Sequence, residues 1–228
     1  MRNRYSILVG LIFLALIVVA TVHTLRDRGS EWTLGLDRPP ARWPLPQFAV
    51  PAAVGGPEAD ANVAPEADAN VAQDDCEVAA IPCPADAERS PACRIAAAGA
   101  IRVCDLFDRP LVISFWFTKG GGECAAQQDV VDTVFRRYRG RVSFLSLDIR
   151  DDREEVRELV RRRGWEMPVG YDRDGAVASL YRVGGCPTFA YAYPGGTLQG
   201  ASSGELDAAG LEARVEELLR ATREAETG

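Results

Sequence analysis

The chain has 228 residues, enough for one membrane anchor, one linker and one domain with a hydrophobic core. Its formal net charge of −7 argues against nucleic acid or anionic lipid as a partner, because both require a basic protein surface. The single histidine, His23, ends an apolar run near the N-terminus, which excludes Ser-His-Asp catalysis, Cys-His catalysis and histidine-bound zinc. We therefore expect no metal and no cofactor, and any chemistry must come from cysteines, carboxylates, arginines or the backbone.

The segment Tyr5–Leu25 is apolar and carries no charge. At about 1.5 Å per residue it is long enough to cross a hydrocarbon core of about 30 Å. A cleaved signal peptide is the alternative, but the segment lacks a small-x-small cleavage site at its end. We expect residues 1–28 to be a cytoplasmic stub and a single-pass anchor in the cell membrane. An even number of cysteines follows this segment, which places the C-terminal domain on the oxidising, extracytoplasmic side.

We interpret residues 29–75 as a linker, because they are rich in Pro, Ala and Asp. The octapeptide PEADANVA occurs twice in tandem, at residues 57–64 and 65–72. Two copies with so little apolar content cannot bury a face, so we interpret them as a solvated spacer. The segment PLPQFAVP at residues 44–51 is the exception, because its alternating apolar residues indicate an ordered edge segment.

Residues 76–104 form a cysteine-containing extension to which we assign structural disulfides. If residues 98–99 form a two-residue hairpin turn, Cys93 and Cys104 lie opposite each other at a distance that a disulfide can bridge. Cys76 and Cys83 would then be the remaining pair. Six cysteines allow 15 pairings, however, so the connectivity stays open.

From residue 105 onwards the hydrophobic periodicity is regular. It predicts strands over residues 111–117, 141–149 and 186–193, a turn at 194–196 with one further strand, and helices over 124–140, 151–164 and 206–226. The helix over 151–164 opens with acidic and closes with basic residues, as the helix dipole favours. This order indicates an α/β domain over residues 105–228, with a central mixed sheet and helices on both faces.

Four motifs in this order resemble the thioredoxin superfamily, and in particular the membrane-anchored oxidoreductases of the TlpA and ResA type. They are DRPLVISFWF, RVSFLSLDIRDDREEVRELVRRRGW, MPVGYDRDGAVASLYRV and GGCPTFAYAYPGG. The resemblance implies a thioredoxin-like fold and thiol-disulfide exchange with protein thiols or disulfides outside the cytoplasm. It also implies that Pro187 is cis and faces the active-site sulfur.

The loop after the first motif departs from the Cys-X-X-Cys of that family. It reads FWFTKGGGEC, with glycines in the place of the first cysteine and Cys124 one residue beyond the place of the second. The spacing to Cys124 is similar to that of peroxiredoxins, which makes an antioxidant peroxidase an alternative function. Phe117 and Gly121 replace the Pro and Thr of the peroxiredoxin motif, so we expect peroxide reactivity to be poor.

Cys186 directly precedes Pro187, and the resemblance places it against the start of the first long helix, where Cys124 lies. We therefore predict a redox-active Cys124–Cys186 pair. Cys124 is the expected nucleophile, because a helix N-terminus and the chain's single lysine, Lys119, would lower the pKa of its thiol. Glu123 would oppose this by its charge or would carry a proton. An inert structural disulfide in a redox-silent binding module is the remaining alternative.

Overall fold

The computed structural model describes residue 36 and residues 42–54, 71–72, 92–94, 99–119 and 123–227. The predicted anchor Tyr5–Leu25, the repeat at 57–70, Cys76, Cys83 and Gly120 to Gly122 lie outside the described residues. Within the ranges that the structure does describe, no helix has the length and apolar character needed to cross a membrane.

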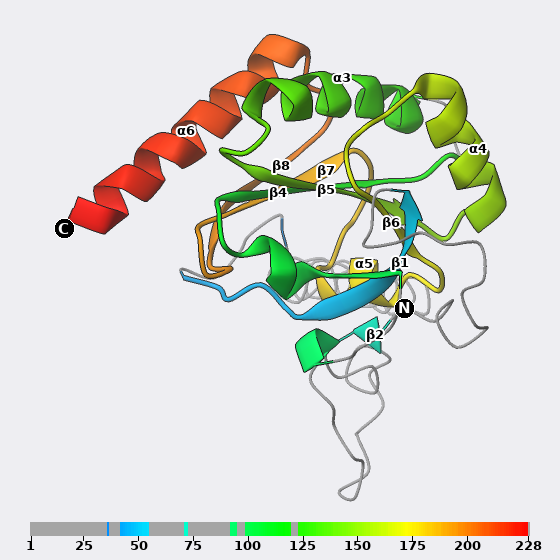
Figure 1. Cartoon of the computed structure of the whole chain (residues 1–228), viewed down its shortest axis with the longest axis horizontal. Helices are drawn as coiled ribbons and strands as arrows, with labels where there is room; N and C mark the ends of the chain where they lie inside the picture. The colour runs from blue at the N-terminus through cyan, green and yellow to red at the C-terminus, as the bar shows by residue number, and fades with distance from the viewer. Residues whose placement is uncertain are drawn as a thin grey trace, which may run out of the picture.

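One sheet of eight strands runs through the middle of the molecule (Figure 1). The three central strands β4, β5 and β6 are parallel; β7 pairs antiparallel with β4, and β8 pairs antiparallel with β7. In the order of the sheet the strands are β2 (Val71–Ala72), β1 (Phe48–Val54), β6 (Val169–Asp172), β5 (Ser143–Ile149), β4 (Leu111–Trp116), β7 (Thr188–Ala192) and β8 (Leu198–Ser203), and β3 (Ala100–Arg102) pairs with β1. The expected mixed sheet is therefore confirmed.

Helices cover both faces of the sheet, as predicted. Figure 1 shows α3 (Glu123–Tyr138) and α6 (Ala208–Thr227) above the sheet and α5 (Ala176–Leu180) below it. The side chains of α3, α6 and α4 (Arg153–Arg163) share one core cluster with Trp116. The other face buries a second cluster, in which Tyr181 packs on the rings of Phe48 and Phe115. Because β4 lies between the two clusters, all six of its residues are buried, which explains its uninterrupted apolar sequence.

The sheet also takes in strands from the ranges 29–75 and 76–104, ahead of the domain expected from residue 105. The alternating apolar residues near position 48 form β1, which pairs antiparallel with β6 through Ala52 and Gly170. Gly170 permits this contact, because a Cβ there would lie 2.8 Å from Val50 Cγ2 and 3.1 Å from Leu147 Cδ1. The ordered segment expected at residues 44–51 thus belongs to the main sheet.

A disulfide joins Cys93 and Cys104, with their Cα atoms 5.9 Å apart. The geometry differs from the hairpin suggested by the sequence. Cys93 lies in the 3-10 helix η2 (Ala92–Arg94) and Cys104 in η3 (Val103–Leu106), while β3 between them pairs with β1. The pairing of these two cysteines is as expected, but two helical turns bring them together instead of two facing strands.

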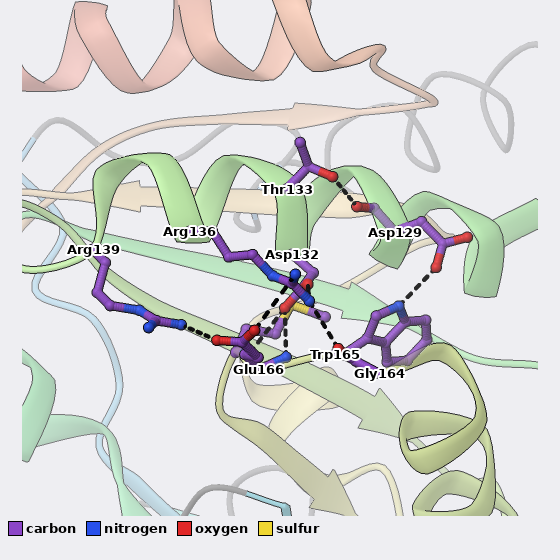
Figure 2. A network of polar contacts seen from close by, with 9 residues as sticks. Asp129, Asp132, Thr133, Arg136, Arg139, Gly164, Trp165 and Glu166 are labelled. Carbon is purple, nitrogen blue, oxygen red and sulfur yellow. Dashed lines mark hydrogen bonds and ion pairs between the residues drawn. The ribbon is translucent and has the colours of Figure 1, made fainter.

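Helix α3 is fixed to the segment that leads from α4 into β6 (Figure 2). The buried carboxylate of Asp132 accepts hydrogen bonds from the backbone N–H groups of Glu166, at 2.6 Å, and Met167, at 3.0 Å. The indole N–H of Trp165 donates to Asp129 at 2.7 Å. The bond to Met167 satisfies a buried backbone N–H, and all three bonds connect α3 to this segment.

Candidate redox site

The antiparallel pairing of β4 with β7 brings the two predicted cysteines together. Phe115 near the end of β4 lies opposite Thr188 at the start of β7. Cys124 follows β4 in the first turn of α3, and Cys186 precedes β7, so both lie where β4 ends and β7 begins. They form a disulfide with their Cα atoms 5.8 Å apart. The peptide bond between Cys186 and Pro187 is cis, as the resemblance implies.

The two cysteine residues differ in their exposure. Cys124 is buried, with 9 % of its surface exposed, whereas Cys186 is only partly buried against the same core cluster. The loop before Cys186 includes the exposed Gly184 and Gly185. Thr188 fixes this loop by donating from its hydroxyl to the carbonyl of Gly185 at 2.7 Å. Cys186 is therefore the more exposed residue of the pair.

A buried polar cluster lies beneath the first turn of α3. The amide nitrogen of Gln128 donates to the hydroxyl of Ser114 at 3.1 Å and to the carbonyl of Cys124 at 3.5 Å. Its amide oxygen accepts from the hydroxyl of Ser146 at 2.9 Å. The two serines are register neighbours on β4 and β5. These hydrogen bonds connect the start of α3 to strands β4 and β5. In the sequence, Gln128 was the only indication of this cluster.

Lys119 lies against the turn between β5 and α4. Its ammonium group is exposed and donates to the carbonyl of Arg150 at 3.4 Å. Glu123 is the first residue of α3, but its side chain lies outside the described part of the structure, as do the three preceding glycines. The structure thus places Cys124, Cys186 and Pro187 together and directs Lys119 towards the neighbouring turn.

An open groove of ≈ 490 Å³ lies beside the first turn of α3 and along α4. Thr118 and Ala125 line it on the side of the disulfide, and charged residues of both signs together with Leu159 line it along α4.

Two buried carboxyl groups lie where β5 leads into α4, and the sequence analysis did not single them out. Asp148 is fully buried and Asp151 is 3 % exposed. The N–H of Asp151 donates to Oδ1 of Asp148 at 3.3 Å, and the N–H of Thr118 donates to Oδ2 of Asp151. Burial is the main cause that raises the pKa of Asp148 to about 9, and the hydrogen bond and negative charge of Asp151 add to it. Asp148 lies within β5 and Asp151 shortly after it, and no local sequence pattern distinguishes these acids from exposed ones.

No protein-family model matches the chain. It is 22% identical over 119 residues to the thiol-disulfide oxidoreductase ResA of Oceanobacillus iheyensis, a match that covers 52% of this chain and 62% of that protein. The chain therefore spans somewhat less than two thirds of the length of this relative.

Solved structures similar to this chain include a secreted disulfide oxidoreductase of Mycobacterium tuberculosis, with 21% identity and a TM-score of 0.48 over 53% of this chain and 90% of that one. StoA of Bacillus subtilis has 13% identity and a TM-score of 0.45, over 51% of this chain and 88% of that one.

The buried carboxyl groups of Asp148 and Asp151 predict a pH effect on stability. Folded Asp148 keeps its proton up to about pH 9, whereas an unfolded aspartate loses it near pH 3.9. Between these values the folded state binds the extra proton, so rising pH favours unfolding. Asp148→Asn removes this dependence. We expect the free energy of unfolding of the variant, relative to wild type, to rise by up to about 1.4 kcal/mol per pH unit across this window.

Denaturant unfolding of the oxidised protein at a series of pH values measures this difference. Asp108→Asn is the matched control, because Asp108 is exposed and pairs with Arg109 at the surface. The control should follow the wild-type pH dependence. Equal slopes for wild type and Asp148→Asn would contradict the assignment of a proton to Asp148.

Proposed function

We propose that this protein is a membrane-tethered, extracytoplasmic thiol-disulfide oxidoreductase that acts on protein thiols or disulfides through Cys124 and Cys186. The observation that carries the proposal is the disulfide between the first turn of α3 and the residue before the cis proline. The similarity to ResA, a thiol-disulfide oxidoreductase, supports it. Peroxide reduction is less well supported, because Phe117 and Gly121 stand where peroxiredoxins have Pro and Thr.

In the proposed reaction a thiolate of the partner attacks the sulfur of Cys186. The Cys124–Cys186 bond breaks, a mixed disulfide forms on Cys186, and Cys124 leaves as a thiolate. A second thiolate of the partner then attacks the mixed disulfide and releases Cys186. The partner loses two electrons and becomes a disulfide, while the pair becomes two thiols; the reverse sequence reduces a partner disulfide.

Two structural facts favour Cys186 as the sulfur that carries the partner. Cys186 is the more exposed of the two, and access governs which sulfur is attacked. Cys124 lies in the first turn of the 16-residue α3, whose N-terminal dipole stabilises a thiolate and makes it the better leaving group. The sequence alone favours Cys124 as the nucleophile that attacks the partner. Its burial instead favours Cys124 as the resolving sulfur, which attacks the mixed disulfide on Cys186.

A trapping experiment tests the pair and the order of attack. Cys124→Ser removes the resolving sulfur, so we expect mixed disulfides between partner proteins and Cys186 to accumulate in cells. Cys186→Ser should accumulate few adducts. Mass spectrometry after alkylation identifies the sulfur that carries each adduct. The matched control is the double variant Cys93→Ser and Cys104→Ser, which removes the other described disulfide and should trap nothing.

Three outcomes are distinguishable in this experiment. Adducts on Cys186 support the proposal, and adducts confined to Cys124 in the Cys186→Ser variant reverse the order of attack. A purely structural disulfide would trap no partner in either variant, and each would lose about 2–5 kcal/mol of stability.

The membrane location is a separate part of the proposal, and it rests on the uncharged segment Tyr5–Leu25 and on the cysteines that follow it. Protease added to intact spheroplasts should remove the C-terminal domain, because the proposed orientation exposes it outside the cytoplasm. A cytoplasmic protein expressed in the same cells is the control for lysis. Full protection of the domain in intact spheroplasts would overturn this orientation.

A further inference from the structure

The 203–206 segment, which leads from the end of β8 towards α6, is bonded to the first turns of α3. Gln127 lies one helical turn after Cys124 and is 5 % exposed. Its side-chain amide nitrogen donates to the carbonyl of Leu206 at 2.8 Å, and its amide oxygen accepts from the N–H of Leu206 at 2.9 Å. Leu206 belongs to neither β8 nor α6. Gln127 therefore supplies partners to two backbone groups that lie outside regular secondary structure.

The same segment is bonded to the residues that follow Cys186. The N–H of Gly204 donates to the carbonyl of Pro187 at 3.0 Å. Ser203, the last residue of β8, is the register partner of Thr188, and the hydroxyl groups of these two residues are hydrogen-bonded at 3.3 Å. The 203–206 segment therefore contacts the chain close to each cysteine of the pair.

The link through this segment does not involve the sulfur atoms. Reduction of the disulfide changes none of the donors and acceptors named above. Leu206 and Cys186 also pack against the core cluster that contains Cys124. If the two bonds of Gln127 broke, a buried carboxamide and two backbone groups would lose these partners, which is unfavourable in a place with little access to water. The hydrogen bonds and the packing thus favour the same arrangement with and without the disulfide.

We propose that Gln127 is a positioning residue that holds the thiol of Cys124 beside that of Cys186 in the reduced protein. It acts through the 203–206 segment and thereby sets the equilibrium between the two thiols and their disulfide. The inference rests on the exchange reaction proposed above. Closure of a disulfide within one chain is favoured in proportion to the effective concentration of one thiol at the other. A link that restricts their separation raises this concentration, so it stabilises the disulfide and lowers the reduction potential of the pair.

Two substitutions weaken the link at its two ends. Gln127→Met keeps nearly the length of the side chain but removes the amide that bonds to Leu206. We expect the equilibrium constant for disulfide formation to fall about tenfold, which raises the midpoint potential of the pair by about 30 mV. Gly204 has a φ of +95°, a backbone conformation that strains alanine. Gly204→Ala should therefore weaken the bond to Pro187 and shift the potential in the same direction.

Asp132→Ala is the matched control for a loss of stability on the same helix. The carboxylate of Asp132 also accepts from two backbone N–H groups, those of Glu166 and Met167. These residues lie before β6 and not in the 203–206 segment. Asp132→Ala should therefore lower the free energy of unfolding and leave the potential of the pair unchanged.

The test equilibrates the full chain with a small dithiol, and alkylation with mass spectrometry then counts the free thiols of Cys124 and Cys186. In this equilibrium the dithiol passes two electrons and two protons to the pair and becomes a disulfide, while the pair becomes two thiols. A second measurement needs no variant: hydrogen exchange of the Leu206 N–H in the reduced wild-type protein. Exchange should be slow, because the bond to Gln127 persists without the disulfide.

A wild-type potential in Gln127→Met would overturn the proposal, and so would an equal shift in Asp132→Ala. Rapid exchange of the Leu206 N–H in the reduced wild-type protein would overturn it as well, even if Gln127→Met does not fold. Equilibration with a small dithiol needs no protein partner. Failure of the trapping experiment would therefore count against the proposed function and leave the difference between the variants intact.

Discussion

The antiparallel contact between β4 and β7 is the constraint on which the site depends. It sets the end of β4 beside the start of β7. The segment that enters α3 and the segment that contains the cis proline therefore meet at this end of the two strands. The Cys124–Cys186 disulfide forms across this meeting point. Most thioredoxin-like oxidoreductases that the sequence resembles carry both sulfurs in one Cys-X-X-Cys motif. Here the two sulfurs come from different elements, so the disulfide links α3 to the loop before β7.

Hydrogen bonds of buried side chains also hold α3 in place. On the sheet side, Gln128 ties the first turn to Ser114 and Ser146 in the centre of the protein. Further along the helix, Asp132 binds the backbone that leads into β6 (Figure 2). Buried polar groups lower stability unless each finds its partner, so such bonds permit few alternative positions for the helix. Reduction of the disulfide would thus leave Cys124 and Cys186 close to their oxidised positions, which keeps the pair ready to close again.

Much of the fold could be predicted from the sequence, because periodicity and end signals are local. The acidic start of α4 and the glycine at its end appear in the structure as an Asp152 N-cap and a left-handed Gly164. The cis proline and the proximity of the two cysteines followed from a resemblance to whole motifs. Strand β1 lies in a range with the composition of a linker, and its place in the sheet depends on β6 and on the absence of a side chain at Gly170. The Asp148–Asp151 pair was missed because burial of an acid is a tertiary property that no local pattern reveals.

The midpoint potential of the Cys124–Cys186 pair tests the central claim most directly, because it asks whether the disulfide can exchange electrons with protein thiols at all. It can be measured by equilibrating the protein with dithiol buffers and counting alkylated Cys124 and Cys186 by mass spectrometry, with Cys93–Cys104 as an internal structural reference. A catalytic pair is expected well above about −300 mV, the upper range of structural disulfides. A potential at or below that value, equal to that of the reference pair, would contradict a redox role for the site.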